Sequence, residues 1–174
     1  MEIKTIRLLS WTGITAGLTD LVLPIDTTGR YHVPDGYFLI SVIDGYSRYI
    51  VHHELRTSME EYDVEITIER ALEKFPFERP GLISDNGSQY VSRDFAEFLR
   101  LTGLQHTRTS VGYPQSNGKI ERFHESISQE CLRKRSLIDI EDARKQVAEY
   151  IEYYNTRRLH SALYYLTPED YLNG

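Results

Sequence analysis

Hydrophobic and polar positions follow two different periods along the chain, and the changes of period separate predicted strands from predicted helices. Residues 37–44 form a run rich in β-branched and aromatic side chains, 45–48 form a turn with glycine, and a second such run begins at residue 49. Two runs around a short turn predict an antiparallel hairpin. Residues 81–85 predict a short apolar strand that ends in a carboxylate, and 104–109 predict another strand.

Apolar residues recur at helical spacing in four further segments. The first helix is expected to begin at Ser58, in a capping box with Glu61, and to stop at Pro76. The other three are marked by their inward-facing residues: Phe95, Phe98 and Leu99, ending near Gly103; Ile120, Phe123 and Ile127; and Val147, Tyr150, Ile151 and Tyr154, over about 140–154. Strands followed by alternating strands and helices predict a mixed α/β sheet flanked by helices.

The composition is that of an ordinary globular domain. The 174 residues are 40% hydrophobic and 26% charged, which argues against a disordered or fibrous chain. No apolar run approaches the ~18 residues of a membrane span, and the single cysteine, Cys131, cannot form an internal disulfide. We therefore expect one domain over 1–174 in the cytoplasm, with an atypical segment at 1–20 and no helix-turn-helix domain. The net charge of −6 points by itself away from a general nucleic-acid binder.

Two carboxylates stand at positions where chemistry is possible. Asp85 closes a predicted strand and precedes the tight-turn pair Asn86-Gly87, which leaves its side chain at the C-terminal edge of that strand. Glu121 lies in the first turns of the third predicted helix, and 35 residues separate it from Asp85. Each also has a plain structural interpretation, Asp85 as a turn residue and Glu121 as a partner of the helix dipole. No cysteine and histidine set has the spacing of a zinc site.

Four motifs occur in an order that resembles a known family. They are IDGYSRYIV at 43–51, LISDNG at 82–87, GYPQSNGKIERFH at 112–124, and YYNTRRLHSAL with a following LTP within 153–168. Together they resemble the retroviral-type integrase core, especially as bacterial insertion-sequence transposases carry it, over about residues 26–174. The resemblance implies an RNase H-like α/β fold, with a five-stranded mixed sheet flanked by helices on both faces.

The family's catalytic set is two aspartates and a glutamate, and the resemblance assigns the second and third to Asp85 and Glu121. The first is expected on the first strand, about 18 residues before Asp44, and 44 − 18 = 26 selects Asp26. The segment WTGIT at 11–15 also resembles the family's motif around the first aspartate, but it has Gly13 at the position of the acid. The three carboxylates would hold Mg²⁺ or Mn²⁺, since hard oxygen ligands suit these cations. Two ions are expected with DNA bound, because two ions can serve both the attacking and the leaving oxygen.

Amide and basic side chains around this centre are the expected DNA contacts. They are Gln115, Ser116, Asn117, Lys119, Arg122, Arg157 and Arg158, with a further basic cluster at 133–135. A solvated helix end is the alternative for each basic cluster. Ser128 and Glu125 stand where related transposases often carry basic residues, which weakens the expected grip on DNA. His124, one helical turn after Glu121, lies near the metal ions, is packed in the core or is solvated.

The resemblance implies metal-dependent DNA strand cleavage and strand transfer during transposition. The expected partners are element-end and target DNA, a second copy of the chain in a homo-oligomer such as a dimer, and a separate N-terminal DNA-recognition domain or protein. The expected location is the bacterial cytoplasm, at the nucleoid, with no membrane partner. The alternative is a catalytically impaired module that only dimerises or binds DNA, which would be favoured if Asp26 lay outside the acid cluster.

Overall fold

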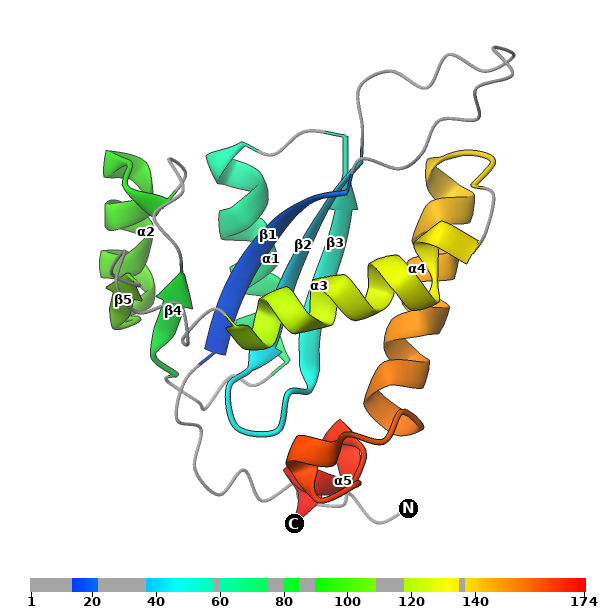
Figure 1. Ribbon diagram of the computed structural model, residues 1–174. Helices are drawn as coiled ribbons and strands as arrows, with labels where there is room; N and C mark the ends of the chain where they lie inside the picture. Colours follow the sequence, from blue (N-terminus) through cyan, green and yellow to red (C-terminus); the bar gives the residue numbers. More distant parts are fainter. Residues whose placement is uncertain are drawn as a thin grey trace, which may run out of the picture.

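A mixed sheet of five strands, in the order β3-β2-β1-β4-β5, organises the computed structural model (Figure 1). The structure describes residues 14–21, 37–57, 60–74, 80–84, 90–108, 118–134 and 137–174. The strands are β1 (Ile14–Leu21), β2 (Tyr37–Asp44), β3 (Ile50–Arg56), β4 (Leu82–Ser84) and β5 (His106–Arg108). Strands β1, β2 and β3 pair antiparallel, whereas β4 runs parallel to both β1 and β5. The predicted α/β class is confirmed.

The predicted hairpin is strands β2 and β3, paired from Phe38 opposite Arg56 to Ile43 opposite Ile50. Strand β2 is almost wholly buried because both of its faces are covered. Its odd-numbered residues, such as Leu39, pack in one core cluster, and its even-numbered residues, such as Ile40, pack in another. The period-2 alternation of a strand thus supplies two cores from one run of apolar residues.

Helices cover both faces of the sheet. Helices α1 (Glu61–Glu73) and α2 (Arg93–Thr102) pack on the Ile40 face, and α3 (Gly118–Glu130) and α4 (Ile140–Thr156) pack on the Leu39 face. Two 3₁₀ turns, Leu132–Lys134 and Ser161–Leu163, and a short helix α5 (Pro168–Asn173) complete the described elements. The inward-facing residues predicted for α4 are all buried, and Gly103 ends α2 with a φ of 70°. None of the helices within the described ranges is long and apolar enough to cross a bilayer.

The start of α1 differs from the prediction. The residue before the first helical residue is Glu60, not Ser58, and the backbone N–H of Glu60 donates to Asp63 Oδ2 at 3.0 Å. Asp63 also forms an ion pair with Arg56 of β3, between Oδ1 and Nη1 at 3.3 Å. The helix therefore begins where one carboxylate can cap its first turn and hold the neighbouring strand.

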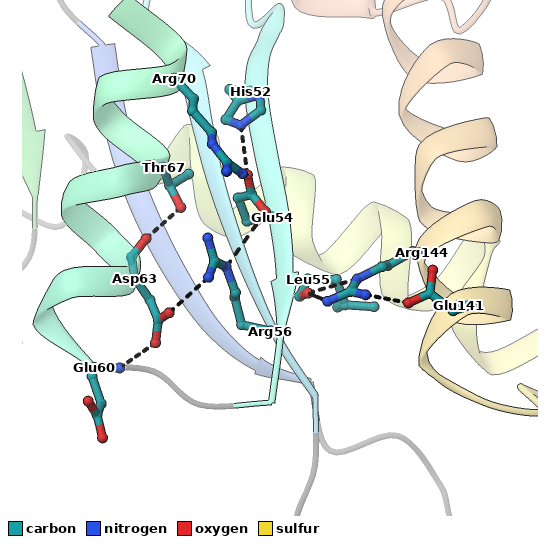
Figure 2. A network of polar contacts seen from close by, with 10 residues as sticks. All are labelled: His52, Glu54, Leu55, Arg56, Glu60, Asp63, Thr67, Arg70, Glu141 and Arg144. Atoms are coloured by element: carbon teal, nitrogen blue, oxygen red, sulfur yellow. Dashed lines mark hydrogen bonds and ion pairs between the residues drawn. The ribbon is translucent and has the colours of Figure 1, made fainter.

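Charged side chains cover the exposed edge of the sheet at β3 (Figure 2). The guanidinium of Arg144, on α4, donates to the Leu55 carbonyl from Nη2 at 3.2 Å and from Nε at 3.3 Å. On the other side, the carboxylate of Glu54 pairs with Arg70 of α1. An edge strand whose carbonyls are already bonded is a poor template for pairing with another chain.

Candidate functional site

The turn between β2 and β3 is built around one buried carboxylate. Asp44 is 1% exposed, and its Oδ2 accepts hydrogen bonds from the backbone N–H and the hydroxyl of Ser47, at 2.7 and 2.6 Å. The N–H of Arg48 donates to the Asp44 carbonyl at 2.9 Å, and Arg48 has a left-handed φ of 63°. A non-glycine residue holds such a φ only where its surroundings fix it, at a cost of roughly 1–3 kcal/mol. The turn is therefore rigid.

Helix α3 begins beside this turn. Its residues Ile120 and Phe123 are buried in the core, which fixes the rotation of the helix about its axis. The Nζ of Lys119 donates to the carbonyl of Gly45 in the turn. Glu121 lies in the first helical turn on the exposed side, and within the described residues its carboxylate makes no hydrogen bond or ion pair. This carboxylate is available to a cation.

The second predicted acid adjoins strand β4. The last residue of the strand, Ser84, is fully buried, and its Oγ lies 2.8 Å from Nε2 of His106 on β5. Burial lowers the pKa of His106, with a smaller effect in the same direction from the charge of Arg108. Asp85 follows Ser84 directly and lies outside the described residues. Its predicted role stays a prediction.

The first strand does not contain the predicted first acid. Strand β1 ends at Leu21, and Asp26 lies five residues further on (26 − 21), outside the described residues. The single acidic residue within β1 is Asp20, opposite Phe38 on β2, and the two β1 residues that pair with β4 carry no carboxylate. The role of Asp26 and its relation to the other two acids stay predictions.

The predicted DNA contacts have different surroundings. Gln115, Ser116 and Asn117 lie outside the described residues. Arg122 is exposed, and its Nε lies 3.8 Å from the carboxylate of Glu125. Arg157 is exposed, and its side chain makes no hydrogen bond or ion pair within the described ranges. Arg158 is instead held by Glu130 of α3, with Nη2 to Oε1 at 2.8 Å and Nε to Oε2 at 3.0 Å. Their DNA roles stay predictions.

The C-terminal motif fastens α4 to the sheet. Asn155, on α4, accepts from the Ile50 N–H through Oδ1 at 2.9 Å and donates to the Ile50 carbonyl through Nδ2 at 3.1 Å, as a neighbouring strand would. The hydroxyl of Tyr150 donates to Glu130 at 2.9 Å, and the hydrogen bonds from Arg158 lower the pKa of Glu130. The motif therefore holds α4 to β3 through Asn155 and to α3 through Arg158.

His124 is packed in the core. It is 5% exposed, its Nε2 lies 3.4 Å from the Ser41 hydroxyl of β2, and burial lowers its pKa to about 4. The imidazole is therefore neutral at pH 7. Of the interpretations that the sequence leaves open for His124, packing in the core is the one that the structure supports.

The metal-ligating potential of the described residues rests on Glu121. No group of three or more histidine, cysteine, aspartate or glutamate side chains comes together within the described ranges. Because Asp26 and Asp85 lie outside those ranges, Glu121 is the one predicted ligand whose surroundings are known. An exposed carboxylate at a helix start, with hard oxygen donors and no competing partner in the described residues, fits a divalent cation.

Sequence reasoning missed the structural roles of Asp44, Ser47 and Asn155. The Asp-x-x-Ser spacing in the turn is a local signal, because an aspartate side chain readily bonds backbone a few residues on. Asn155 gives no such signal, since its partner Ile50 is 105 residues away in sequence.

Comparison with known proteins gives a consistent picture. A family model described as Integrase core domain matches residues 20–114, and a second model with the same description matches residues 102–168. The transposase for insertion sequence element IS904 of Lactococcus lactis is 34% identical over 137 residues, which cover 77% of this chain and 54% of that protein. The putative transposase InsK for IS150 of Escherichia coli K12 is 32% identical over 137 residues, 78% of this chain and 48% of that protein. The chain thus spans about half the length of these curated relatives.

Solved structures share the fold. The HTLV-2 integrase catalytic core domain in complex with magnesium, in its dimeric form, superimposes with a TM-score of 0.64 at 15% identity over 95% of this chain and 99% of that chain. A chain of the simian T-cell lymphotropic virus intasome in complex with PP2A regulatory subunit B56 gamma gives a TM-score of 0.69 at 15% identity, over 96% and 56% of the two chains. These structural neighbours are RNase H-like, and at this identity they show the fold alone.

Proposed function

The chain belongs to the integrase core domain family, and from this premise we propose that it acts in DNA transposition as a metal-dependent core for strand cleavage and strand transfer. The observation that carries the proposal is the position of Glu121. Its carboxylate is exposed on the first turn of α3 and unpaired within the described residues, while Ile120, Phe123 and Lys119 hold the surrounding helix in place.

The proposed site consists of Asp26, Asp85 and Glu121 with Mg²⁺ or Mn²⁺. When bound, the ions would polarise the phosphodiester and favour an oxygen nucleophile at neutral pH. The carboxylates of this chain would hold the ions, and the exposed guanidiniums of Arg122 and Arg157 would bind DNA phosphate. The amides of Gln115 and Asn117 and the hydroxyl of Ser116 are proposed contacts of the same DNA. A homo-oligomer is part of the proposal, in keeping with the dimeric and trimeric forms of the HTLV-2 core.

A second candidate function has an observation in its favour. The two β1 residues that pair with β4 carry no carboxylate, and β1 ends five residues before Asp26. If Asp26 does not reach the other two acids, the chain is a non-catalytic module that binds DNA or dimerises.

A nicking assay separates the two functions. The purified chain is incubated with supercoiled plasmid and Mg²⁺ or Mn²⁺, alongside Asp26→Asn, Asp85→Asn and Glu121→Gln. The matched control is Glu125→Gln, which removes an exposed carboxylate one helical turn further along α3. The catalytic proposal expects nicking that needs the divalent ion and is lost in the three variants but not in the control. No nicking by the wild type, or full activity of Asp85→Asn, would overturn it, and DNA binding without nicking would support the second candidate.

A further inference from the structure

We infer that Lys119 is a positioning residue. It ties the first turn of α3, which carries Glu121, to the hairpin turn, and it is not a contact to DNA phosphate. The inference rests on the proposed function for the importance of Glu121. Its basis is the hydrogen bond from Lys119 Nζ to the carbonyl of Gly45, which joins residues 74 apart in sequence. Within the described residues, this hydrogen bond links the first turn of α3 directly to the turn of the hairpin.

The acceptor of this bond is held rigidly. Gly45 lies between Asp44, which is bonded twice by Ser47, and the left-handed Arg48. The turn is also supported from the C-terminal side, because the ring of Tyr46 lies 4.9 Å from the ring of Tyr171 on α5. An ammonium that donates to so fixed a carbonyl takes a defined position rather than the many positions of a solvated lysine.

Because Lys119 and Glu121 lie on the same helical turn, a fixed position of Lys119 also fixes the position of Glu121. Residues two apart in an α-helix do not face each other, so a helix held to the turn through Lys119 carries Glu121 on a different side. Between them, Ile120 is 2% exposed and buried in the core, and Phe123 is fully buried. The first turn of α3 is thus held by the core and by the hairpin turn, and Glu121 occupies the side left open.

The test compares Lys119→Met, which keeps the aliphatic stem, with Lys119→Arg, which restores an N–H donor. The matched control is Lys145→Met, an exposed lysine on α4. For Lys119→Met we expect kcat for Mn²⁺-dependent plasmid nicking to fall about ten- to a hundredfold, as for a displaced catalytic group, with KM for DNA within about twofold. Lys119→Arg should recover most of kcat, and Lys145→Met should resemble the wild type.

Two readouts do not depend on catalysis. Amide hydrogen exchange in the first turn of α3 should become faster in Lys119→Met alone. The slope of log K against log salt for binding a 30-base-pair duplex should stay unchanged, whereas a lost phosphate contact would flatten it by about 0.9. A flatter slope with unchanged exchange would overturn the inference. If the wild type does not nick DNA, the proposed function fails while exchange and slope still decide the role of Lys119.

Discussion

Replacing Asn155 tests whether the C-terminal motif docks α4 onto β3. In Asn155→Ala the N–H and the carbonyl of Ile50 lose their partners, and Ile50 is 3% exposed, so water replaces those bonds poorly. A buried polar group left unpaired costs about 1–3 kcal/mol. For two such groups with partial relaxation we expect a loss of about 2–4 kcal/mol in the free energy of unfolding. For a chain of this size that loss lowers Tm by roughly 4–16 °C.

Asn155→Asp gives a sharper test because its effect depends on pH. One carboxylate oxygen can still accept from the Ile50 N–H, but the other faces the Ile50 carbonyl and repels it unless it carries a proton. Folding therefore raises the pKa of the introduced carboxyl above its unfolded value of about 3.9. A raised folded pKa means that stability is retained below the unfolded pKa and is lost as pH rises through the folded pKa. The deficit of this variant relative to wild type should be small near pH 4 and larger at pH 7.

Urea unfolding at both pH values, followed by circular dichroism, measures these deficits. Asn173→Ala is the matched control, because Asn173 is exposed on α5 and its loss should change the free energy of unfolding by less than about 0.5 kcal/mol. A loss below about 1 kcal/mol in Asn155→Ala, or a deficit in Asn155→Asp that does not grow with pH, would refute the docking role.

Three further outcomes are expected. Burial lowers the pKa of His124 to about 4, so unfolding takes up a proton below pH 6.5. Stability should therefore fall as pH drops from 6.5 toward 4. In urea titrations, His124→Gln should flatten that pH dependence. Arg158→Met should cost about 1 kcal/mol at pH 7 by thermal unfolding. That cost should shrink as pH falls through the lowered pKa of Glu130, and a constant cost would contradict the ion-pair account. Ser128→Lys should tighten binding to duplex DNA and steepen its salt slope by about 0.9, which affinity measurements at several salt concentrations would check.

The local parts of this fold follow from the sequence. The β2–β3 hairpin is predicted because each strand is a continuous β-rich run and the turn between them is short. Gly103 ends α2 with a positive φ, which a sequence pattern of apolar spacing followed by glycine already indicates. Helix α4 extends two residues beyond the predicted end. In each case the signal and the structure occupy the same few residues.

The parts that depend on distant pairing do not follow from the sequence. Strand β1 mixes small, polar and apolar residues without a clear period, and its place is set by β2 and β4 on either side. Asp26 follows β1 outside the described residues, so the position of the first acid stays a prediction. Helix α1 begins after Glu60 rather than at Ser58, where Asp63 both accepts from the Glu60 N–H and pairs with Arg56 of β3, a tertiary contact.

The two motifs at 43–51 and 153–168 form parts of one structural unit. Three helices contact the hairpin. Lys119 of α3 donates to the Gly45 carbonyl, and Asn155 of α4 exchanges two hydrogen bonds with Ile50. The ring of Tyr171 of α5 lies against the ring of Tyr46. Helices α3 and α4 reach the hairpin through apolar packing and also through polar bonds to its backbone. A hairpin fixed by three helices can hold the first turn of α3 still while the exposed side of that turn stays open. The asparagine of the YYN segment thus holds the strand that follows the turn to which Lys119 is bonded.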